Sequence, residues 1–242
     1  MGGIPAWKRG IDLACCLIAL PVLCLIAGIM AIYLRFVSRG PVLFKQERVG
    51  YKGSRFMCYK FRTMRAGADT KSHQAYLDNL MVSRTPMVKL DSKGDSRVIP
   101  GAWLLRATGL DELPQIINIY RREMSIVGPR PCIPYEYEKY EPAQKKRFDA
   151  VPGLTGLWQV SGKNRTTFEE MVALDIKYSV TNTFWLDIGI ILKTVPALIT
   201  QVIDTRMARK SSIPARAPSA HPHTVHPSGR PIVKRTPQTV AS

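Results

Sequence analysis

The longest apolar run of the chain extends from Leu13 to Leu34 and contains no charged residue. As one helix rising about 1.5 Å per residue, it would nearly cross a bilayer core of roughly 30 Å. Pro21 divides the run into arms of 8 and 13 residues, and neither arm is long enough to span. The run is flanked by positive charges on both sides: Lys8 and Arg9 before it, and Arg35, Arg39, Lys45 and Arg48 after it.

The rule that keeps basic flanks on the cytoplasmic side applies to both ends of this run. The pattern therefore favours a re-entrant helix that enters the membrane, breaks at Pro21 and returns. A single kinked span is the alternative that the pattern leaves open.

Period-two alternation next predicts a β-hairpin, with strands over 42–49 and 55–62 joined by a turn at Gly50-Tyr51-Lys52-Gly53. Alternation along the second strand places Lys60 and Arg62 on one face.

Three further segments carry helix signals. Residues 110–121 predict a helix with Pro114 in its first turn, and the charged stretch 134–148 predicts a solvated helix. Thr167-Phe168-Glu169-Glu170 predicts a capping box that opens a helix burying Met171, Leu174 and Tyr178. Between the hairpin and these helices, the polar stretch 66–97 reads as a surface insertion with a short helical patch.

A last apolar stripe recurs at spacings of 3 and 4, which places its members on one face of a helix: Trp185, Ile188, Leu192, Val195 and Ile199. Such a stripe fits either an ordinary core or an interfacial helix lying flat on a bilayer.

The 242 residues carry a formal net charge of +17, which indicates a polyanionic neighbour such as anionic lipid, phosphate substrates or nucleic acid. Beyond Asp204 the chain has seven basic residues and no acidic one, and its composition is typical of a disordered tail. The five cysteines show no disulfide or metal spacing, which favours a reducing compartment.

The predicted fold is α+β: a small, mostly helical membrane-surface domain with a short β-hairpin, a Pro-broken re-entrant helix and interfacial amphipathic helices. The predicted divisions are 1–40 for the membrane helix and its flanks, 41–205 for a catalytic domain on the cytosolic face, and 206–242 for the basic, Pro-rich tail.

Asp111-Glu112 is the leading candidate for chemistry, because common nucleotide-binding loops are absent from the sequence and His73 is the only histidine before the tail. The pair precedes Pro114, so it lies at a helix N-terminus that favours negative charge, a phosphate or a metal ion. Arg106 lies upstream and could neutralise a phosphate. A plain helix cap is the simpler interpretation of such acids.

Two loops are further candidates. In Gly128-Pro129-Arg130-Pro131, two prolines stiffen the backbone around Arg130, whose guanidinium suits phosphate oxygens, although a simple turn has the same pattern. The segment 152–164, which includes Gln159, could line a substrate pocket or form a turn and an edge strand.

Taken together, short motifs spread over about residues 5–204 resemble the bacterial sugar transferase family, the monotopic polyprenyl-phosphate phosphoglycosyl transferases in their minimal catalytic form. The motifs are Lys8-Arg9-x-x-Asp12, Gly40-Pro41-Val42, Gln46-x-Arg48-Val49-Gly50, Tyr59-Lys60-Phe61-Arg62-Thr63-Met64, Leu110-Asp111-Glu112-Leu113-Pro114-Gln115, Met124-Ser125-x-Val127-Gly128-Pro129-Arg130-Pro131 and Pro152-Gly153-Leu154-Thr155-Gly156. The chain departs from the family pattern at 99–106, where an upstream arginine is missing, at Lys163, where arginine is commoner, and in its basic tail.

The resemblance implies transfer of a sugar 1-phosphate from a UDP-sugar to polyprenyl (undecaprenyl) phosphate, with release of UMP, as the first membrane step of exopolysaccharide or other surface glycan synthesis. Asp111 would be the nucleophile, and Glu112, with Asp111, would hold Mg²⁺. The implied substrate-binding residues are Arg106, Arg130, Lys60, Arg62 and Gln159.

The implied setting is the cytoplasmic face of the bacterial inner membrane, in contact with its lipids; a homo-oligomer is compatible with the sequence. Two other classes of protein are weighed against the enzyme: a membrane-anchored protein that binds an anionic polymer, and a non-catalytic scaffold. No recognition helix or basic aromatic face indicates nucleic acid, and the intact Asp111-Glu112 pair argues against the scaffold.

Overall fold

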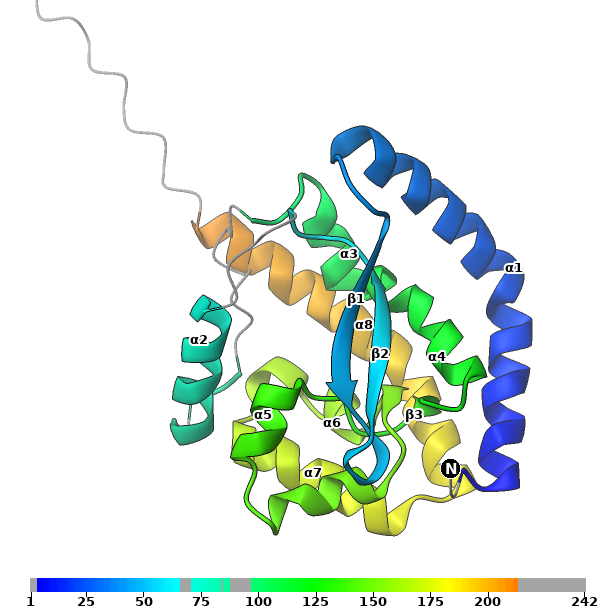
Figure 1. The fold of residues 1–242 in the computed structure, drawn as a ribbon, viewed down its shortest axis with the longest axis vertical. Coiled ribbons are helices and arrows are strands. Elements are labelled where there is room, and N and C mark those ends of the chain that lie inside the picture. Colours follow the sequence, from blue (N-terminus) through cyan, green and yellow to red (C-terminus); the bar gives the residue numbers. More distant parts are fainter. Residues whose placement is uncertain (1–3, 66–70, 84, 88–96, 213–242) are drawn as a thin grey trace, which may run out of the picture. The chain divides into compact units, whose positions relative to one another are not determined.

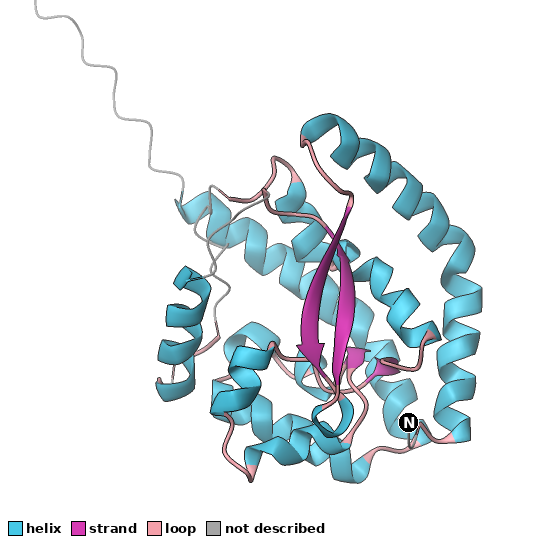
Figure 2. Cartoon of the chain, viewed as in Figure 1, coloured by secondary structure: helices cyan, strands magenta, loops and turns pink. Residues whose placement is uncertain are grey.

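The computed structural model describes residues 4–65, 71–83, 85–87 and 97–212; its elements are drawn in Figure 1 and coloured by type in Figure 2. The helices are α1 (Ala6–Val37), α2 (Lys71–Val82), α3 (Ala102–Thr108), α4 (Ile116–Tyr120), α5 (Pro134–Lys139), α6 (Leu157–Val160), α7 (Phe168–Thr181) and α8 (Phe184–Ser212). The short 3₁₀ helices are η1 (Tyr51–Gly53), η3 (Leu110–Gln115), η4 (Gln144–Asp149) and η5 (Lys163–Arg165). The strands are β1 (Leu43–Val49), β2 (Arg55–Phe61), β3 (Ser125–Val127) and β4 (Gly153–Thr155).

The predicted hairpin is confirmed. Strands β1 and β2 pair antiparallel, with Leu43 opposite Phe61 and Val49 opposite Arg55. The turn between them uses two left-handed residues, Lys52 and Gly53, with φ of 49° and 77°. A second sheet was not predicted: β3 and β4 pair in parallel over three residues each, which is too short to leave an alternation signal.

The predicted capping box of α7 is also confirmed. The Thr167 hydroxyl accepts from the Glu170 amide and the Glu170 carboxylate accepts from the Thr167 amide, at 3.2 and 2.8 Å. The helix buries Met171 and Tyr178, as the pattern predicts, with Leu174 half-buried.

The prediction of one solvated helix over 134–148 is wrong. The segment forms α5 and η4, separated by an irregular stretch, and it contributes Tyr140 and Phe148 to the largest core cluster. Arg147 is buried with them and pairs with Asp175 of α7 at 2.5 Å. The high charge of the segment suggested full exposure, but Arg147 is buried because its partner Asp175 is buried as well.

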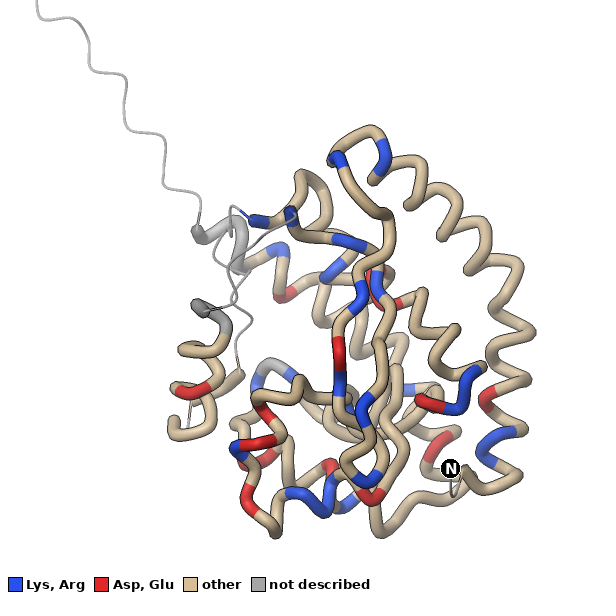
Figure 3. The backbone as a smooth tube through the Cα atoms, in the orientation of Figure 1, with Lys and Arg blue, Asp and Glu red and all other residues tan. Residues whose placement is uncertain are grey.

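The long apolar helix α1 stays helical through Pro21 and bends near its middle, where Pro21 lies (Figure 1). A break in the helix at Pro21 is therefore not observed. The middle of the helix lies outside the packed domain: Leu17 and Ile18 are 71% and 80% exposed. Figure 3 shows that this part of α1 carries no charge.

Both ends of α1 are fastened to the same domain. Near its start, Lys8 Nζ lies 2.5 Å from Asp187 Oδ2 of α8, and Asp12 Oδ1 accepts from the Ser125 hydroxyl and the Ile126 amide at 2.8 Å each. Near its end, Met30 and Leu34 pack into a cluster with residues of β2 and α3. The helix thus leaves the domain and comes back to it.

The exposure of α8 excludes one of the two interpretations of the last stripe. Trp185, Leu192, Val195 and Ile199 are exposed and Ile188 is half-buried, so the stripe is not the core of the domain. The buried residues of the helix, Asp187, Ile190 and Gln201, lie outside this stripe. Ala6–Val37 and Phe184–Met207 are both long and apolar enough to cross a membrane by length and composition. An exposed apolar stripe agrees with an interfacial helix.

The remaining divisions are partly described. In the predicted insertion, α2 packs Leu80 against the core that α7 lines, while the rest of 66–97 is largely outside the described residues. The predicted tail boundary at 206 falls inside α8, which continues to Ser212. The first residues of the predicted tail, 206–212, are therefore helical, and 213–242 lie outside the described part of the chain.

Candidate active site

The Asp111-Glu112 pair lies in η3, immediately after a sharp turn. Helix α3 ends at Thr108, and Gly109 takes the left-handed conformation (φ 75°, ψ 6°) that redirects the chain into η3. A Cβ at position 109 would meet Leu198 Cδ2 at an ordinary contact distance of 3.8 Å, so the backbone conformation is what favours glycine there. The predicted helix over 110–121 is present as η3 followed by α4, with Pro114 inside η3.

Two cations hold the Glu112 carboxylate. Lys60 Nζ, from β2, donates to Oε1 at 2.8 Å, and Arg130 donates to Oε1 at 2.9 Å and to Oε2 at 3.4 Å. Burial by itself raises the pKa of Glu112, but the charges and hydrogen bonds of Arg130 and Lys60 hold that pKa well below its usual range. Glu112 is therefore an anion at neutral pH.

Asp111 is buried next to this network, with 8% of its surface exposed. The charge of Glu112, and with a smaller effect that of Asp111, raises the pKa of Arg130. Both carboxylates of the pair therefore act electrostatically on the same guanidinium.

The loop that carries Arg130 packs so closely against its neighbours that position 128 has no room for a side chain. The Gly128 amide donates to the Thr155 carbonyl at 2.8 Å, and a Cβ at Gly128 would lie 2.1 Å from the Val151 carbonyl oxygen. Behind the loop, buried Arg147 donates to the Arg130 carbonyl at 3.1 Å. The stiff presentation of Arg130 that its flanking prolines predict is therefore reinforced by backbone packing and by Arg147.

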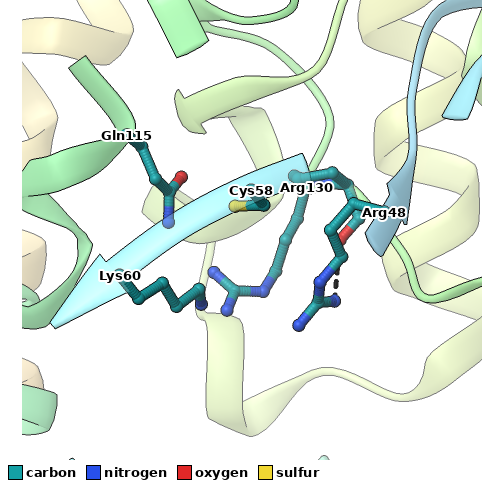
Figure 4. A pocket seen from close by; sticks show the side chains of 6 residues that line it. Arg48, Cys58, Lys60, Gln115 and Arg130 are labelled. Atoms are coloured by element: carbon teal, nitrogen blue, oxygen red, sulfur yellow. Dashed lines mark hydrogen bonds between the residues drawn. The ribbon is translucent and has the colours of Figure 1, made fainter. Parts of the chain in front are cut away.

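Arg48 is a third cation at this site, and the residue-by-residue prediction did not select it. A cavity of about 10 Å³ next to the pair is lined by Arg48, Cys58, Lys60, Gln115, Arg130 and Pro131. Figure 4 shows the head groups of Lys60, Arg130 and Arg48 in a row among the residues that line this cavity. Arg48 donates to the Pro131 carbonyl at 3.1 Å and to Gln46 Oε1 at 2.6 Å. The signal was present in the motif that contains Arg48, but β1 had to pair with β2 before Arg48 could be placed.

Three cations around two carboxylates make this a site with excess positive charge. Burial, with the neighbouring charge of Arg130, lowers the pKa of Arg48, so an arriving anion would relieve repulsion between the two guanidinium groups. Arginine forks match phosphate oxygens in geometry. The arrangement suits a carboxylate nucleophile acting on a phosphate.

The other predicted substrate-binding residues are Arg62, Arg106 and Gln159, of which Arg106 lies in α3, the helix just before η3. Arg62 follows the end of β2 and donates to the carbonyls of Arg39 and Ser38 at 2.6 and 2.8 Å, so it holds the end of α1. Arg106 donates to the Thr63 hydroxyl at 3.1 Å. Gln159 is buried in α6, beside a different cavity.

Among the described residues, no group of three or more Asp, Glu, His or Cys side chains converges as a metal site would require. Asp111 and Glu112 provide two adjacent carboxylates. That donor set fits Mg²⁺, which often binds through one or two carboxylates and completes its shell with water and substrate phosphates.

The sequence model of the bacterial sugar transferase family matches residues 4–201, and the chain belongs to this family. It is 42% identical over 196 residues to the galactosyl transferase CpsE of Streptococcus agalactiae, which covers 79% of this chain and 42% of that protein. It is 36% identical over 202 residues to the exopolysaccharide production protein ExoY of Sinorhizobium fredii, covering 82% and 87%.

A third relative is the UDP-glucose:undecaprenyl-phosphate glucose-1-phosphate transferase of Caulobacter vibrioides, 35% identical over 201 residues that cover 80% of this chain and 70% of that protein. The chain therefore spans less than half of CpsE but most of ExoY.

Proposed function

We propose that this protein transfers a sugar 1-phosphate from a UDP-sugar to polyprenyl phosphate, releases UMP and thereby begins the synthesis of a surface glycan. The observation that carries the proposal is the Asp111-Glu112 pair beside Arg130, Lys60 and Arg48, on a domain with two exposed apolar helices. The name of the Caulobacter relative supports this reaction class, and the name of the Sinorhizobium relative supports a role in exopolysaccharide production.

The reaction has two displacements at one phosphorus atom. In the first, a carboxylate oxygen of Asp111 attacks the sugar-linked phosphorus of the UDP-sugar, and the bond from that phosphorus to the UMP oxygen breaks. In the second, an oxygen of polyprenyl phosphate attacks the same phosphorus and the bond to Asp111 breaks. The product is polyprenyl diphosphate sugar, and Asp111 is again a free carboxylate.

The cations around Asp111 would stabilise the charge that develops on the phosphate oxygens. Arg130 and Lys60 already share an anion, Glu112, and a phosphate entering beside them gives their remaining N–H groups further acceptors. Glu112 holds both side chains in place before substrate arrives, which reduces the reorganisation required during the reaction.

The same carboxylates are the proposed ligands of Mg²⁺, because the described residues provide no larger acidic cluster. When bound, the ion would neutralise the diphosphate and its leaving group. The remaining steps are carried by Asp111 and by the side chains that orient the phosphate.

We propose further that α1 is re-entrant and that the domain lies on the cytoplasmic face of the inner membrane. Lys8 and Asp12 attach the start of α1 to the domain, and Leu34 attaches its end, so both ends belong on one side of the bilayer. The exposed stripe of α8 would rest in the same interface. This geometry brings the site to the depth of a lipid phosphate.

The proposed reaction predicts UMP release from at least one UDP-sugar when purified protein in detergent is given polyprenyl phosphate and a panel of UDP-sugars. Because the first displacement does not need the lipid, radiolabelled UMP should also exchange into that UDP-sugar without polyprenyl phosphate. Absence of turnover with every sugar nucleotide would favour the non-catalytic scaffold. Turnover without exchange would instead contradict a covalent Asp111 intermediate.

The re-entrant topology predicts that a cysteine at Gly2, in a chain whose native cysteines are replaced, is not labelled from outside the cell. Pro21→Leu removes a penalty of about 3 kcal/mol for proline inside a straight helix, and it should let part of the population span and become labelled. Val22→Leu is the matched control, since it leaves Pro21 in place and should stay unlabelled. Labelling of the unsubstituted Pro21 chain would establish an ordinary single span.

A further inference from the structure

A second cavity lies between the segment 159–165 and helix α8. It has a volume of about 150 Å³ and is lined by Gln159, Val160, Gly162, Lys163, Arg165, Ala197, Thr200, Gln201 and Asp204. None of these residues lines the small cavity at Glu112. The volume is several times the roughly 30 Å³ of a water molecule and below the 300 Å³ at which pockets for drug-sized ligands begin, so it suits a single-ring group.

Gln159, which lines this cavity, has a buried side-chain amide without hydrogen-bond partners among the described residues. The residue is 8% exposed, and neither its Nε2 nor its Oε1 has a hydrogen-bond partner among the described residues. A buried amide without partners is costly and uncommon in folded proteins. Gln159 lines the cavity, and a side-chain amide carries both a donor and an acceptor, the complement of a ligand edge that offers an N–H and a carbonyl oxygen.

The rest of the wall is polar but not a phosphate cradle. Lys163 Nζ donates to Gln201 Oε1 at 2.7 Å, and Arg165 lies 3.4 Å from Asp204 Oδ2. Asp204 places a carboxylate in the lining, paired with Arg165, and its oxygens can accept hydrogen bonds from sugar hydroxyls.

The cavity is connected to the catalytic pair through two short structural links. The Gln201 amide donates to the Ala107 carbonyl at 2.9 Å, just before Gly109 turns the chain into η3. On the other side, a Cβ at Gly156 would lie 2.7 Å from Gln159 Oε1 and 2.2 Å from the carbonyl of Gly128, which begins the Arg130 loop.

We propose that this cavity binds the uracil ring, with the ribose beside it, of the UDP-sugar whose diphosphate lies at Asp111; the inference rests on the proposed function. Gln159 would bond the N3–H and a neighbouring carbonyl of uracil, and Asp204 a ribose hydroxyl. A polyprenyl phosphate offers neither an N–H for the Gln159 amide nor a sugar hydroxyl for the Asp204 carboxylate. The amide and the carboxylate therefore favour the nucleoside over the lipid.

The test is direct binding of UMP and of N3-methyl-UMP to the purified full chain in detergent, measured by equilibrium dialysis. The unsubstituted protein should bind UMP at least tenfold more tightly than the methylated analogue. In Gln159→Met, which keeps the side-chain volume, the two ligands should bind alike, while the KM for polyprenyl phosphate stays unchanged. Gln144→Met, in η4 and outside the lining of the cavity, is the control and should keep the discrimination.

A purely structural role for Gln159 would weaken both ligands equally and so would overturn the assignment. A change in the KM for polyprenyl phosphate with UMP binding intact would assign the cavity to the lipid instead. Photocrosslinking of the unsubstituted protein with 4-thio-UMP avoids dependence on a folded variant, and the label should fall within 159–165 or 197–204. Label confined to other segments would refute the proposal. If the unsubstituted protein showed neither UMP binding nor turnover, the proposed function itself would be refuted.

Discussion

Asp111→Asn is expected to abolish sugar-phosphate transfer, by roughly 10³-fold or more, because the amide cannot act as the nucleophile in the first displacement. Asp111 is buried beside the Glu112–Arg130–Lys60 network, and the substitution keeps its shape, so the fold and the membrane association should persist. The measurement is radiolabelled sugar phosphate attached to the chain after incubation with the labelled UDP-sugar. The unsubstituted protein should be labelled and the variant should not.

Asp149→Asn is the matched control, because this acid is exposed at the end of η4 and has no part in the proposed site. It should keep both turnover and label. Persistent label on Asp111→Asn protein would show that another residue carries the covalent bond.

Asp175→Asn is expected to cost about 3 kcal/mol of folding free energy, because it removes the closest charge partner of the buried Arg147 guanidinium and leaves only Glu136, at 3.7 Å. Both side chains are 1% exposed and their closest N–O distance is 2.5 Å. Arg147 also donates to the Arg130 carbonyl, so the loop that carries Arg130 should loosen as well. The loss of folding free energy is measured by urea unfolding monitored with pulse proteolysis.

Asp78→Asn is the control for this prediction. It removes one partner of an ion pair with Lys139 whose side chains are 45% and 38% exposed, and exposed pairs contribute about 0–1 kcal/mol. Equal effects of the two substitutions would mean that burial of the Arg147 pair is unimportant. Replacing Arg147 by Met together with Asp175 by Leu should recover much of the stability but not the hydrogen bond to the Arg130 loop.

Sequence patterns were sufficient to predict a structural feature where the residues that produce it lie close together in the chain. The hairpin follows from alternation around Gly50 and Gly53, and the start of α7 follows from a cap whose two partners are three residues apart. Likewise, the candidate pair Asp111-Glu112 is adjacent in sequence, and its place in a helical turn is set by Gly109 and Pro114. These features depend on neighbours in the chain, so the sequence is enough to predict them.

Contacts between distant segments were beyond the sequence patterns. Charge alone assigned 134–148 to the surface, but Arg147 is buried because Asp175 is supplied by another helix. Similarly, alternation grouped Arg62 with Lys60, yet Arg62 binds the end of α1 while Lys60 reaches Glu112. A charged side chain is placed by the partner that compensates its desolvation, and that partner is known only once the chain has folded.

By itself, then, the sequence determined the hairpin, the capped helix, the apolar segment with its proline, and the identity of the acidic pair. The tertiary structure decided that Arg48 joins Lys60 and Arg130 around Glu112, that the apolar stripe of α8 faces outward, and that Gln159 lines a separate cavity. The reason is physical: propensity and periodicity act over a few residues, whereas burial and charge pairing depend on which distant segments the fold brings into contact.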